Sequence, residues 1–179
     1  MAPFFNPVKT RWLTLALLTV CCAGTPEPSA AAGPYRDRWS GVVTYVVDGD
    51  TVHVRPLQGG KPVSVRLVGI DAPEICQTGG DTAREVLKQR LVGRQVVIDG
   101  RSRDDYGRLL ARILSDGEDV GARMVKDGHA WSYRSRGRAG PYAAQQRLAE
   151  SARRGIFADS NAPALYPAAF RRQHGSCQR

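Results

Sequence analysis

The chain has 179 residues, 42% of them hydrophobic, and a formal net charge of +9. This length suits one ordinary domain with a short appendage, and the apolar content excludes a chain that is disordered throughout. No apolar run reaches the roughly 18 residues of a full transmembrane helix, so we expect no transmembrane span. Four cysteines are too few for a small protein framed by disulfides.

The positive charge is concentrated near the C-terminus. Residues 131–179 hold nine arginines against two acidic residues, whereas residues 33–130 are nearly neutral. Arginine donors suit phosphate, and a basic face attracts polyanions. The pattern favours nucleic acid as a partner, with anionic lipid, a cell-wall polymer or an ordinary solvated surface as alternatives.

The first 32 residues have the pattern of a secretory signal peptide. Lys9 and Arg11 precede an apolar run over residues 12–22, and a small-residue stretch ends at Ala32. Basic, apolar and small-residue segments in this order are typical of an export signal. We therefore expect residues 1–32 to be a signal peptide and the protein to be periplasmic or secreted.

Two features of this signal stay open. Cleavage after Ala32 and cleavage near Ala23 both fit the small residues. A lipid anchor on Cys21 or Cys22 is the less favoured alternative, because Val20 stands where a small residue is expected.

Export also changes how the other two cysteines are interpreted. Cys76 and Cys177 remain in the mature chain. In an oxidising compartment they can form a disulfide that ties the C-terminal tail to the loop after Glu74. Two free thiols are the alternative, since spacing alone does not test the geometry.

Alternating and β-branched residues predict a β-meander at the start of the mature domain. We expect strands at residues 39–48, 51–55 and 63–70, with tight turns at 48–50 and 58–60. The capping-box spacing of Thr82 and Glu85 predicts a helix that ends near Gly93. The further expected elements are strands at 95–99 and 108–114, helices at 120–126 and 141–154, and an irregular tail at 159–179.

Five short strands with about three helices predict a mainly β fold with α. The arrangement fits a closed five-stranded barrel of the oligonucleotide-binding (OB-fold) type, which places its ligand on one face and on its loops. We expect the domain to span residues 39–158, between the signal peptide and the tail.

Four carboxylates stand at strand ends. Asp48 and Asp50 lie in the first hairpin turn, and Asp71 and Glu74 lie at the exit of the third strand. If the barrel curls enough to bring these two places together, the acids and a backbone carbonyl converge. Hard oxygen ligands of this kind suit Ca²⁺ or Mg²⁺. The alternative is that each acid serves only its turn.

Arg66 and Arg108 are the positive counterpart. Each stands in or beside an apolar strand, where a charge is costly without a partner. A metal that holds a phosphate oxygen, with arginines that neutralise charge at phosphorus, is what a phosphodiester hydrolase needs. The alternative for each arginine is a surface residue or a salt bridge.

Four ordered blocks carry a family resemblance. They are Val-Asp-Gly-Asp-Thr-Val at 47–52, Arg-Leu-Val-Gly-Ile-Asp-Ala-Pro-Glu at 66–74, Asp-Asp-Tyr-Gly-Arg-Leu-Leu-Ala at 104–111 and Gly-His-Ala-Trp at 128–131. In order and spacing this part of the chain resembles the thermonuclease (staphylococcal nuclease-like) family. The resemblance implies a Ca²⁺-dependent nuclease that acts on DNA and RNA and cuts the P–O5′ bond, leaving 3′-phosphate ends.

The resemblance also implies roles for the acidic residues. Asp50 and Asp71 match carboxylate ligands of Ca²⁺, and the backbone carbonyl of Ala72 matches a further ligand. Glu74 matches the residue that acts as general base or positions the attacking water. Asp48 matches an acid that supports the metal loop.

The resemblance implies that Arg66 and Arg108 bind the scissile phosphate and stabilise the transition state. Tyr106 matches a tyrosine near the terminal phosphate. Tyr133 stands where relatives often carry two tyrosines, so base stacking there would rest on it alone or on arginines. A monomer without a stable protein partner is expected.

Two other function classes remain. A non-catalytic nucleic-acid-binding barrel could use the arginine-rich C-terminal part without the acids. An envelope interaction protein held by lipid and charge would show no metal dependence.

Overall fold

The structure, a computed structural model, describes Met1 and residues 37–135, 137–159, 164–175 and 177. The expected signal peptide and its cleavage sites lie outside these residues, as do Cys21 and Cys22. Within the described part, no helix has the length and apolar character needed to cross a bilayer. The helices and strands of the described residues fall within one compact unit, residues 32–179.

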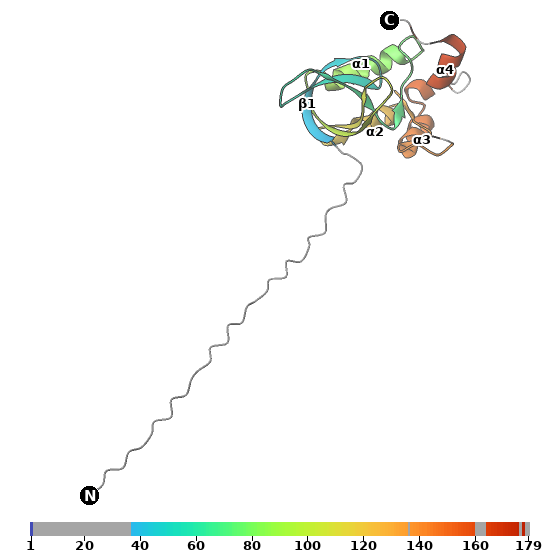
Figure 1. The fold of residues 1–179 in the computed structure, drawn as a ribbon. Helices are drawn as coiled ribbons and strands as arrows, with labels where there is room; N and C mark the ends of the chain where they lie inside the picture. The colour runs from blue at the N-terminus through green and yellow to red at the C-terminus, as the bar shows by residue number, and fades with distance from the viewer. Residues whose placement is uncertain (2–36, 136, 160–163, 176, 178–179) are drawn as a thin grey trace. The chain divides into compact units, whose positions relative to one another are not determined.

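Five strands form a closed barrel (Figure 1). Their order is β3-β2-β1-β5-β6, and each neighbouring pair is antiparallel. Parallel pairing of β3 with β6, in which Val65 lies opposite Leu109, closes the ring. The predicted mainly β, OB-type barrel is therefore confirmed. The strands are β1 (Asp37–Val46), β2 (Thr51–Pro56), β3 (Val63–Leu67), β5 (Gln95–Arg103) and β6 (Leu109–Ser115).

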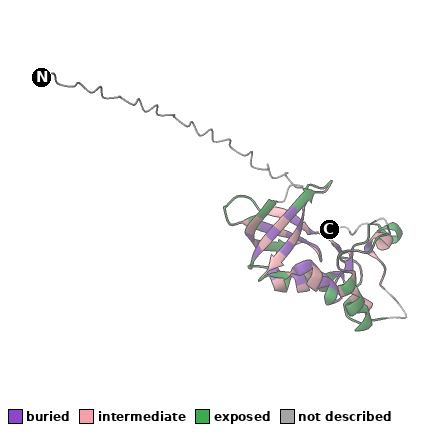
Figure 2. Ribbon diagram, turned by 90° about the horizontal axis from the view of Figure 1, so that it is seen from below, coloured by how far each residue is buried: buried purple, intermediate pink, exposed green. Residues whose placement is uncertain are grey.

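The apolar sides of these strands meet inside the barrel. Burial alternates along the strands, as the purple and pink stripes in Figure 2 show. β-branched residues suit this pleated, half-buried position. The core is made mainly of aliphatic side chains, among them Val43, Val52, Val54, Val65, Ile98 and Ile113, which are all fully buried.

The third expected strand is divided in the structure. β3 ends at Leu67, and a separate short strand, β4 (Ile70–Asp71), follows a turn at Gly69. Gly69 has φ 80°, a conformation that side-chain-bearing residues rarely adopt. β4 leaves the barrel sheet and pairs with β8 (Trp131–Ser132), so Asp71 lies opposite Trp131.

The helices gather on one side of the barrel (Figures 1 and 2). The first begins three residues earlier than a capping box at Thr82 and Glu85 predicts, and that capping box is wrong. The N-cap is Gly79, which has a left-handed backbone and offers no side-chain cap, while Glu85 pairs with Lys88. The helices are α1 (Gly80–Leu91), α2 (Val120–Lys126), α3 (Ala143–Ser151), the 3₁₀ turn η1 (Gly155–Phe157) and α4 (Pro167–His174); the remaining strand is β7 (Glu118–Asp119).

The tail expected to be irregular contains α4. Pro167 occupies the first turn, where its missing N–H costs nothing, and the helix ends at Gly175 with φ 75°. Partners distant in sequence hold this short helix in place, which is why local patterning did not predict it.

The antiparallel register brings the acidic turn to the end of β3 without any curling of the barrel. Thr51 at the start of β2 lies directly opposite Arg66 near the end of β3. The predicted dependence on curling was therefore wrong, since an antiparallel hairpin always places these two ends side by side.

Candidate active site

Asp50, Arg66 and Asp71 form a three-membered ionic cluster at the exit of β3. Nη1 of Arg66 donates to Oδ1 of Asp50 at 3.0 Å, and Nη2 donates to Oδ1 of Asp71 at 3.1 Å. Both carboxylate side chains are 5% exposed, and the guanidinium side chain is 23% exposed. One cation thus bridges two buried anions from different parts of the chain.

The hairpin turn holds Asp50 in place through its backbone and its neighbours. The backbone N–H of Asp50 donates to Oδ1 of Asp48 at 3.1 Å, and the Asp50 carbonyl accepts from the N–H of Leu67 at 2.8 Å. Gly49 permits the turn to approach the next loop, because a Cβ there would lie 2.6 Å from the Cβ of Ala72. The supporting position expected for Asp48 agrees with this contact.

Burial makes the negative charges of the two carboxylates costly. It raises the pKa of Asp50 to about 7, against the opposing effect of Arg66. Burial also raises the pKa of Asp71, which Arg66 and Arg171 oppose. Two desolvated carboxylates share one guanidinium, so a further cation bound beside them would be electrostatically favourable.

The donor chemistry here fits a hard divalent cation. Carboxylate oxygens of Asp50 and Asp71 lie beside the backbone of Ala72, whose N–H lies 3.4 Å from Oδ2 of Asp50. Among the described residues, no group of three or more His, Cys, Asp or Glu side chains has the geometry to hold a metal. A cation at this place would therefore need main-chain oxygen or water to complete its shell.

Arg108 joins the cluster through Thr51. It precedes β6, and its Nη1 lies 3.5 Å from Oγ1 of Thr51, the hydroxyl that donates to Asp50 at 2.9 Å. Asp104 holds the other side of the guanidinium: its Oδ2 accepts from Nε at 2.8 Å and lies 2.7 Å from Nη2 in an ion pair. Arg108 is therefore aimed at the same place as Arg66.

Glu74 stands at the edge of this cluster and pairs with an arginine from the C-terminal helix. Oε1 of Glu74 accepts from Nη1 of Arg171. The backbone N–H of Glu74 donates to Oε1 of Gln77 at 3.1 Å, and Gln77 in turn donates to the carbonyl of Leu165. The side chain of Glu74 remains 25% exposed, so solvent still reaches it.

The two tyrosines predicted to bind substrate are both accessible. Tyr106 is 85% exposed and lies against Arg108, whose Cζ is 5.3 Å from the ring centroid. Tyr133 is 47% exposed and follows β8, where its N–H donates to the carbonyl of Gly69. Their roles stay predictions.

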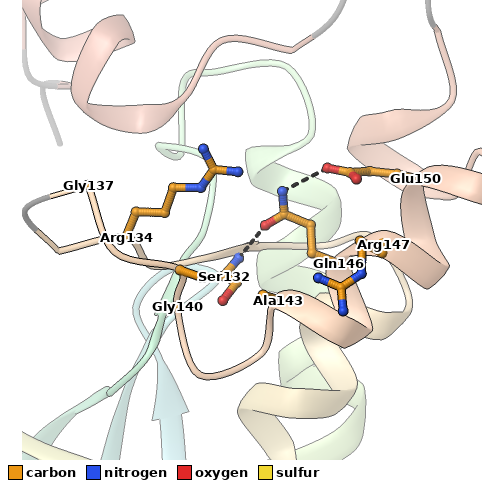
Figure 3. A pocket seen from close by; sticks show the side chains of 9 residues that line it. Ser132, Arg134, Gly137, Gly140, Ala143, Gln146, Arg147 and Glu150 are labelled. Carbon is orange, nitrogen blue, oxygen red and sulfur yellow. Dashed lines mark hydrogen bonds between the residues drawn. The ribbon is translucent and has the colours of Figure 1, made fainter.

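A pocket of about 280 Å³ lies next to Tyr133, between β8 and α3. Gln146 crosses it, accepting from the N–H of Ser132 at 2.8 Å and donating to Glu150 at 2.8 Å (Figure 3). Arg134 and Arg147 line the pocket, which does not include the acidic cluster.

The structure pairs Cys76 with Cys177, as the sequence allowed. Their Cα atoms are 5.7 Å apart, and the bridge links residues 101 positions apart in sequence. It fastens the end of the chain two residues beyond Glu74.

The structure thus brings together all five acidic and basic side chains proposed from sequence, and it adds three that were missed. Asp104 could have been found, because an acid four residues before Arg108 is a common ion-pair spacing. The only sequence feature that pointed to Thr51 was its position next to Asp50. Arg171 gave no signal beyond the general excess of arginine, since its partner is 97 residues away.

Comparison with known proteins places these residues in a family. The sequence model of the staphylococcal nuclease homologue family matches residues 64–159, which include Arg66, Asp71, Glu74 and Arg108. Asp50 and α4 lie outside that match.

Several relatives share this part of the chain. Protein ParB of Escherichia coli is 40% identical over 117 residues, which cover 60% of this chain and 65% of ParB. An uncharacterized endonuclease of Escherichia coli O157:H7 is 35% identical over 122 residues, covering 68% of this chain and 78% of that protein. The micrococcal nuclease of Shigella flexneri is 33% identical over 135 residues, with 68% and 75% coverage. The chain thus spans just under two thirds of ParB and about three quarters of the other two.

The barrel, the ionic cluster at its rim and these matches agree with one another. The chain belongs to the staphylococcal nuclease homologue family, whose enzymes hydrolyse phosphodiester bonds, and its predicted assignment to the nucleases is confirmed.

Proposed function

We propose that this nuclease is exported, depends on Ca²⁺, cleaves both DNA and RNA, and leaves 3′-phosphate ends. The observation that carries the proposal is the buried pair Asp50 and Asp71 bridged by Arg66. Buried acids with too little positive charge around them are costly for stability, and a bound divalent cation removes that cost.

Asp50, Asp71 and the backbone carbonyl of Ala72 would hold the ion. Oxygen ligands in a mixed carboxylate and carbonyl set favour Ca²⁺, whereas Mg²⁺ demands a stricter octahedral shell. When bound, the ion supplies a Lewis acid that stabilises negative charge on a phosphate oxygen.

Three side chains of the protein supply the rest of the chemistry. Arg66 and Arg108 point to the same place from β3 and from the start of β6, so a phosphate there would meet two fixed guanidinium groups. They bind its oxygens and stabilise the charge of the pentacoordinate transition state. Glu74 accepts a proton from the attacking water or orients that water towards phosphorus.

Substrate strands would extend over the neighbouring exposed tyrosines. Tyr106 beside Arg108 lies where it can contact a terminal phosphate, and Tyr133 offers a face for a base. Stacking on aromatic rings tolerates any base, which suits an enzyme that accepts both DNA and RNA.

The proposal is tested by cleavage of single-stranded DNA and RNA of matched sequence by the purified protein. Parallel reactions contain Ca²⁺, Mg²⁺ or excess chelator. We expect cleavage of both substrates in Ca²⁺ and none in chelator. Mass spectrometry of the products should place the new phosphate on the 3′ side. Full activity in chelator would refute the metal dependence, and 5′-phosphate products would refute the cleavage position.

Glu74→Gln is the variant that tests the chemistry. Removal of a general base typically costs about 10²- to 10⁴-fold in rate. We expect kcat to fall by at least about 100-fold, while DNA affinity measured by fluorescence anisotropy and the unfolding temperature stay close to those of the wild type. Wild-type activity in this variant would remove Glu74 from the mechanism.

Export is tested separately by expressing the full chain in a Gram-negative host. We expect a mature protein that has lost its first residues and fractionates with the periplasm or medium, with the N-terminus read by sequencing. An intact N-terminus in the cytoplasm would contradict this part of the proposal alone.

A further inference from the structure

The C-terminal segment, residues 164–175 and 177, lies beyond the part of the chain that matches the family. It nevertheless contacts the short stretch that contains Glu74. Three different contacts join the two, and each involves a different residue of residues 74–77.

The first contact is an ion pair to the side chain of Glu74. Nη1 of Arg171, on α4, donates to Oε1 of Glu74. A guanidinium on one oxygen fixes the orientation of the carboxylate, because a charge-assisted hydrogen bond has a narrow geometry. Within the described part of the chain, the second carboxylate oxygen of Glu74 accepts no hydrogen bond, and the side chain is partly exposed, so a water molecule can reach it.

The second contact holds the backbone. Oε1 of Gln77 accepts from the N–H of Glu74 at 3.1 Å, and the amide nitrogen of Gln77 donates to the carbonyl of Leu165. Gln77 is buried, so both of its bonds are shielded from water. The main chain of Glu74 is therefore linked to the C-terminal segment through one side chain.

The third contact is covalent. The disulfide between Cys76 and Cys177 attaches the end of the segment, and the N–H of Cys76 lies 3.1 Å from Sγ of Cys177. Tyr166 completes the attachment on the other side, since its ring packs against Trp131 with centroids 5.5 Å apart. Trp131 is the β8 residue opposite Asp71.

From this convergence we propose that Arg171 is a positioning residue for Glu74, and that the C-terminal segment is the scaffold that supplies it. Arg171 acts through Glu74 and does not bind the substrate phosphate. The logic is that of a catalytic base whose orientation is fixed by a third group. The inference rests on the proposed role of Glu74.

A double-mutant cycle tests this arrangement. The variants are Arg171→Ala, Arg171→Lys, Glu74→Gln, and Glu74→Gln combined with Arg171→Ala. Arg172→Ala is the matched control, because it removes the same charge from the next position of α4, whose side chain is exposed. Each protein is first checked for an intact disulfide and an unchanged unfolding temperature.

We expect Arg171→Ala to lower kcat at least about tenfold, with KM changed less than about threefold. Arg171→Lys should recover most of that loss, and Arg172→Ala should leave kcat within about twofold of the wild type. In the Glu74→Gln background, Arg171→Ala should have almost no further effect, because residues that act as a unit are not additive.

Two kinetic results would overturn the proposal. Equal losses in both backgrounds with a raised KM would mean that Arg171 contacts the phosphate directly. A raised kcat in Arg171→Ala would mean that α4 obstructs the site.

A second measurement does not depend on activity. Hydrogen exchange of the backbone amides at residues 74–77 should be at least about threefold faster in Arg171→Ala and unchanged in Arg172→Ala. Unchanged exchange in both variants would refute the positioning role. An inactive wild-type protein that still shows the expected exchange would refute the proposed function and leave the positioning role standing.

Discussion

At the scale of single residues, Asp50 links stability to function. Its carboxylate is desolvated by burial, and one shared guanidinium offsets only part of that cost. Poorly compensated charges of this kind are often found at functional sites. The negative charge of Asp50 is therefore unfavourable for the folded protein until a cation binds.

Asp50→Asn tests this relation. The pKa of Asp50 is about 7 in the folded protein, above its ordinary value of 3.8, so the acid stabilises the fold at low pH and loses that contribution as pH rises through 7. Without Ca²⁺ at pH 8, we expect Asp50→Asn to unfold at the wild-type temperature or above it. The temperature shift that Ca²⁺ causes in the wild type should be absent.

Asp81→Asn is the control for this prediction, because it neutralises an exposed acid in the first turn of α1. Thermal unfolding by circular dichroism, with chelator and with Ca²⁺, gives the comparison. Two results would contradict the prediction: an Asp50→Asn protein that unfolds below the wild-type temperature in chelator, and one whose unfolding temperature Ca²⁺ still raises.

Sequence reasoning found the five charged side chains because each stands in a local pattern. Asp50 lies in a turn, Asp71 and Glu74 flank Pro73, and Arg66 and Arg108 stand out beside apolar strands. It did not find which charges pair. Strand register places Arg66 within hydrogen-bond distance of Asp50 and Asp71, and the fold brings Arg171 to Glu74 across 97 positions of sequence. Pairing is a property of the fold and is not visible in spacing.

At the scale of elements, Asp119 joins three pieces of structure around the site. Its Oδ1 accepts from the N–H of Ala122 and caps α2. Its Oδ2 accepts from the hydroxyl of Tyr142 at 2.9 Å, just before α3, and forms an ion pair with Arg112 on β6, whose Nε lies 3.3 Å away. One carboxylate thus fixes α2 and the start of α3 against the barrel.

This contact predicts a loss of stability in alkali. Burial raises the pKa of Tyr142 to about 12, and the neighbouring Asp119 contributes to the shift. Between the ordinary value of 10 and about 12, the unfolded chain releases the proton while the folded chain retains it, so stability falls as pH rises. The full difference is on the order of 2 kcal/mol.

Tyr142→Phe should flatten part of that decline, because phenylalanine has no proton to lose. Urea unfolding at pH 8, 10 and 11 measures the free energy of unfolding for both proteins. The difference in free energy of unfolding between the two proteins should narrow as pH rises, since only the unfolded wild type gains stability by releasing the Tyr142 proton. Parallel curves would mean that folding does not raise the pKa of Tyr142. Tyr166, whose pKa burial also raises to about 12, contributes to the decline that remains.

The elements themselves were predictable to different degrees. Strand alternation and β-branched residues located the five barrel strands, since each pattern is local. The break at Gly69 was missed because an apolar run continues across it. α4 was missed because eight residues are too few to form a stable helix alone, and its stability comes from the disulfide and from the contacts of Tyr166 and Arg171.

At the scale of the whole molecule, a disulfide between chain positions far apart joins the loop after Glu74 to the C-terminal segment. A disulfide stabilises a protein chiefly by restricting the unfolded chain, and the restriction grows with loop length. The bridge joins Cys76 to Cys177 across 101 positions, and the loop that it closes includes β5, β6 and the helices α1, α2, α3 and α4. The compartment in which such a bond persists is an oxidising one, which agrees with the proposed export.

Removal of this disulfide should lower the stability of the folded protein while the barrel stays folded. The closed strand ring and its apolar core do not include either cysteine. We expect Cys177→Ser to lower the free energy of unfolding by about 2 to 4 kcal/mol, measured by urea unfolding. Reductant should lower the wild type to the same level and leave the variant unchanged. An equal effect of reductant on both proteins, or no difference between oxidised wild type and variant, would show that the bridge does not stabilise the molecule.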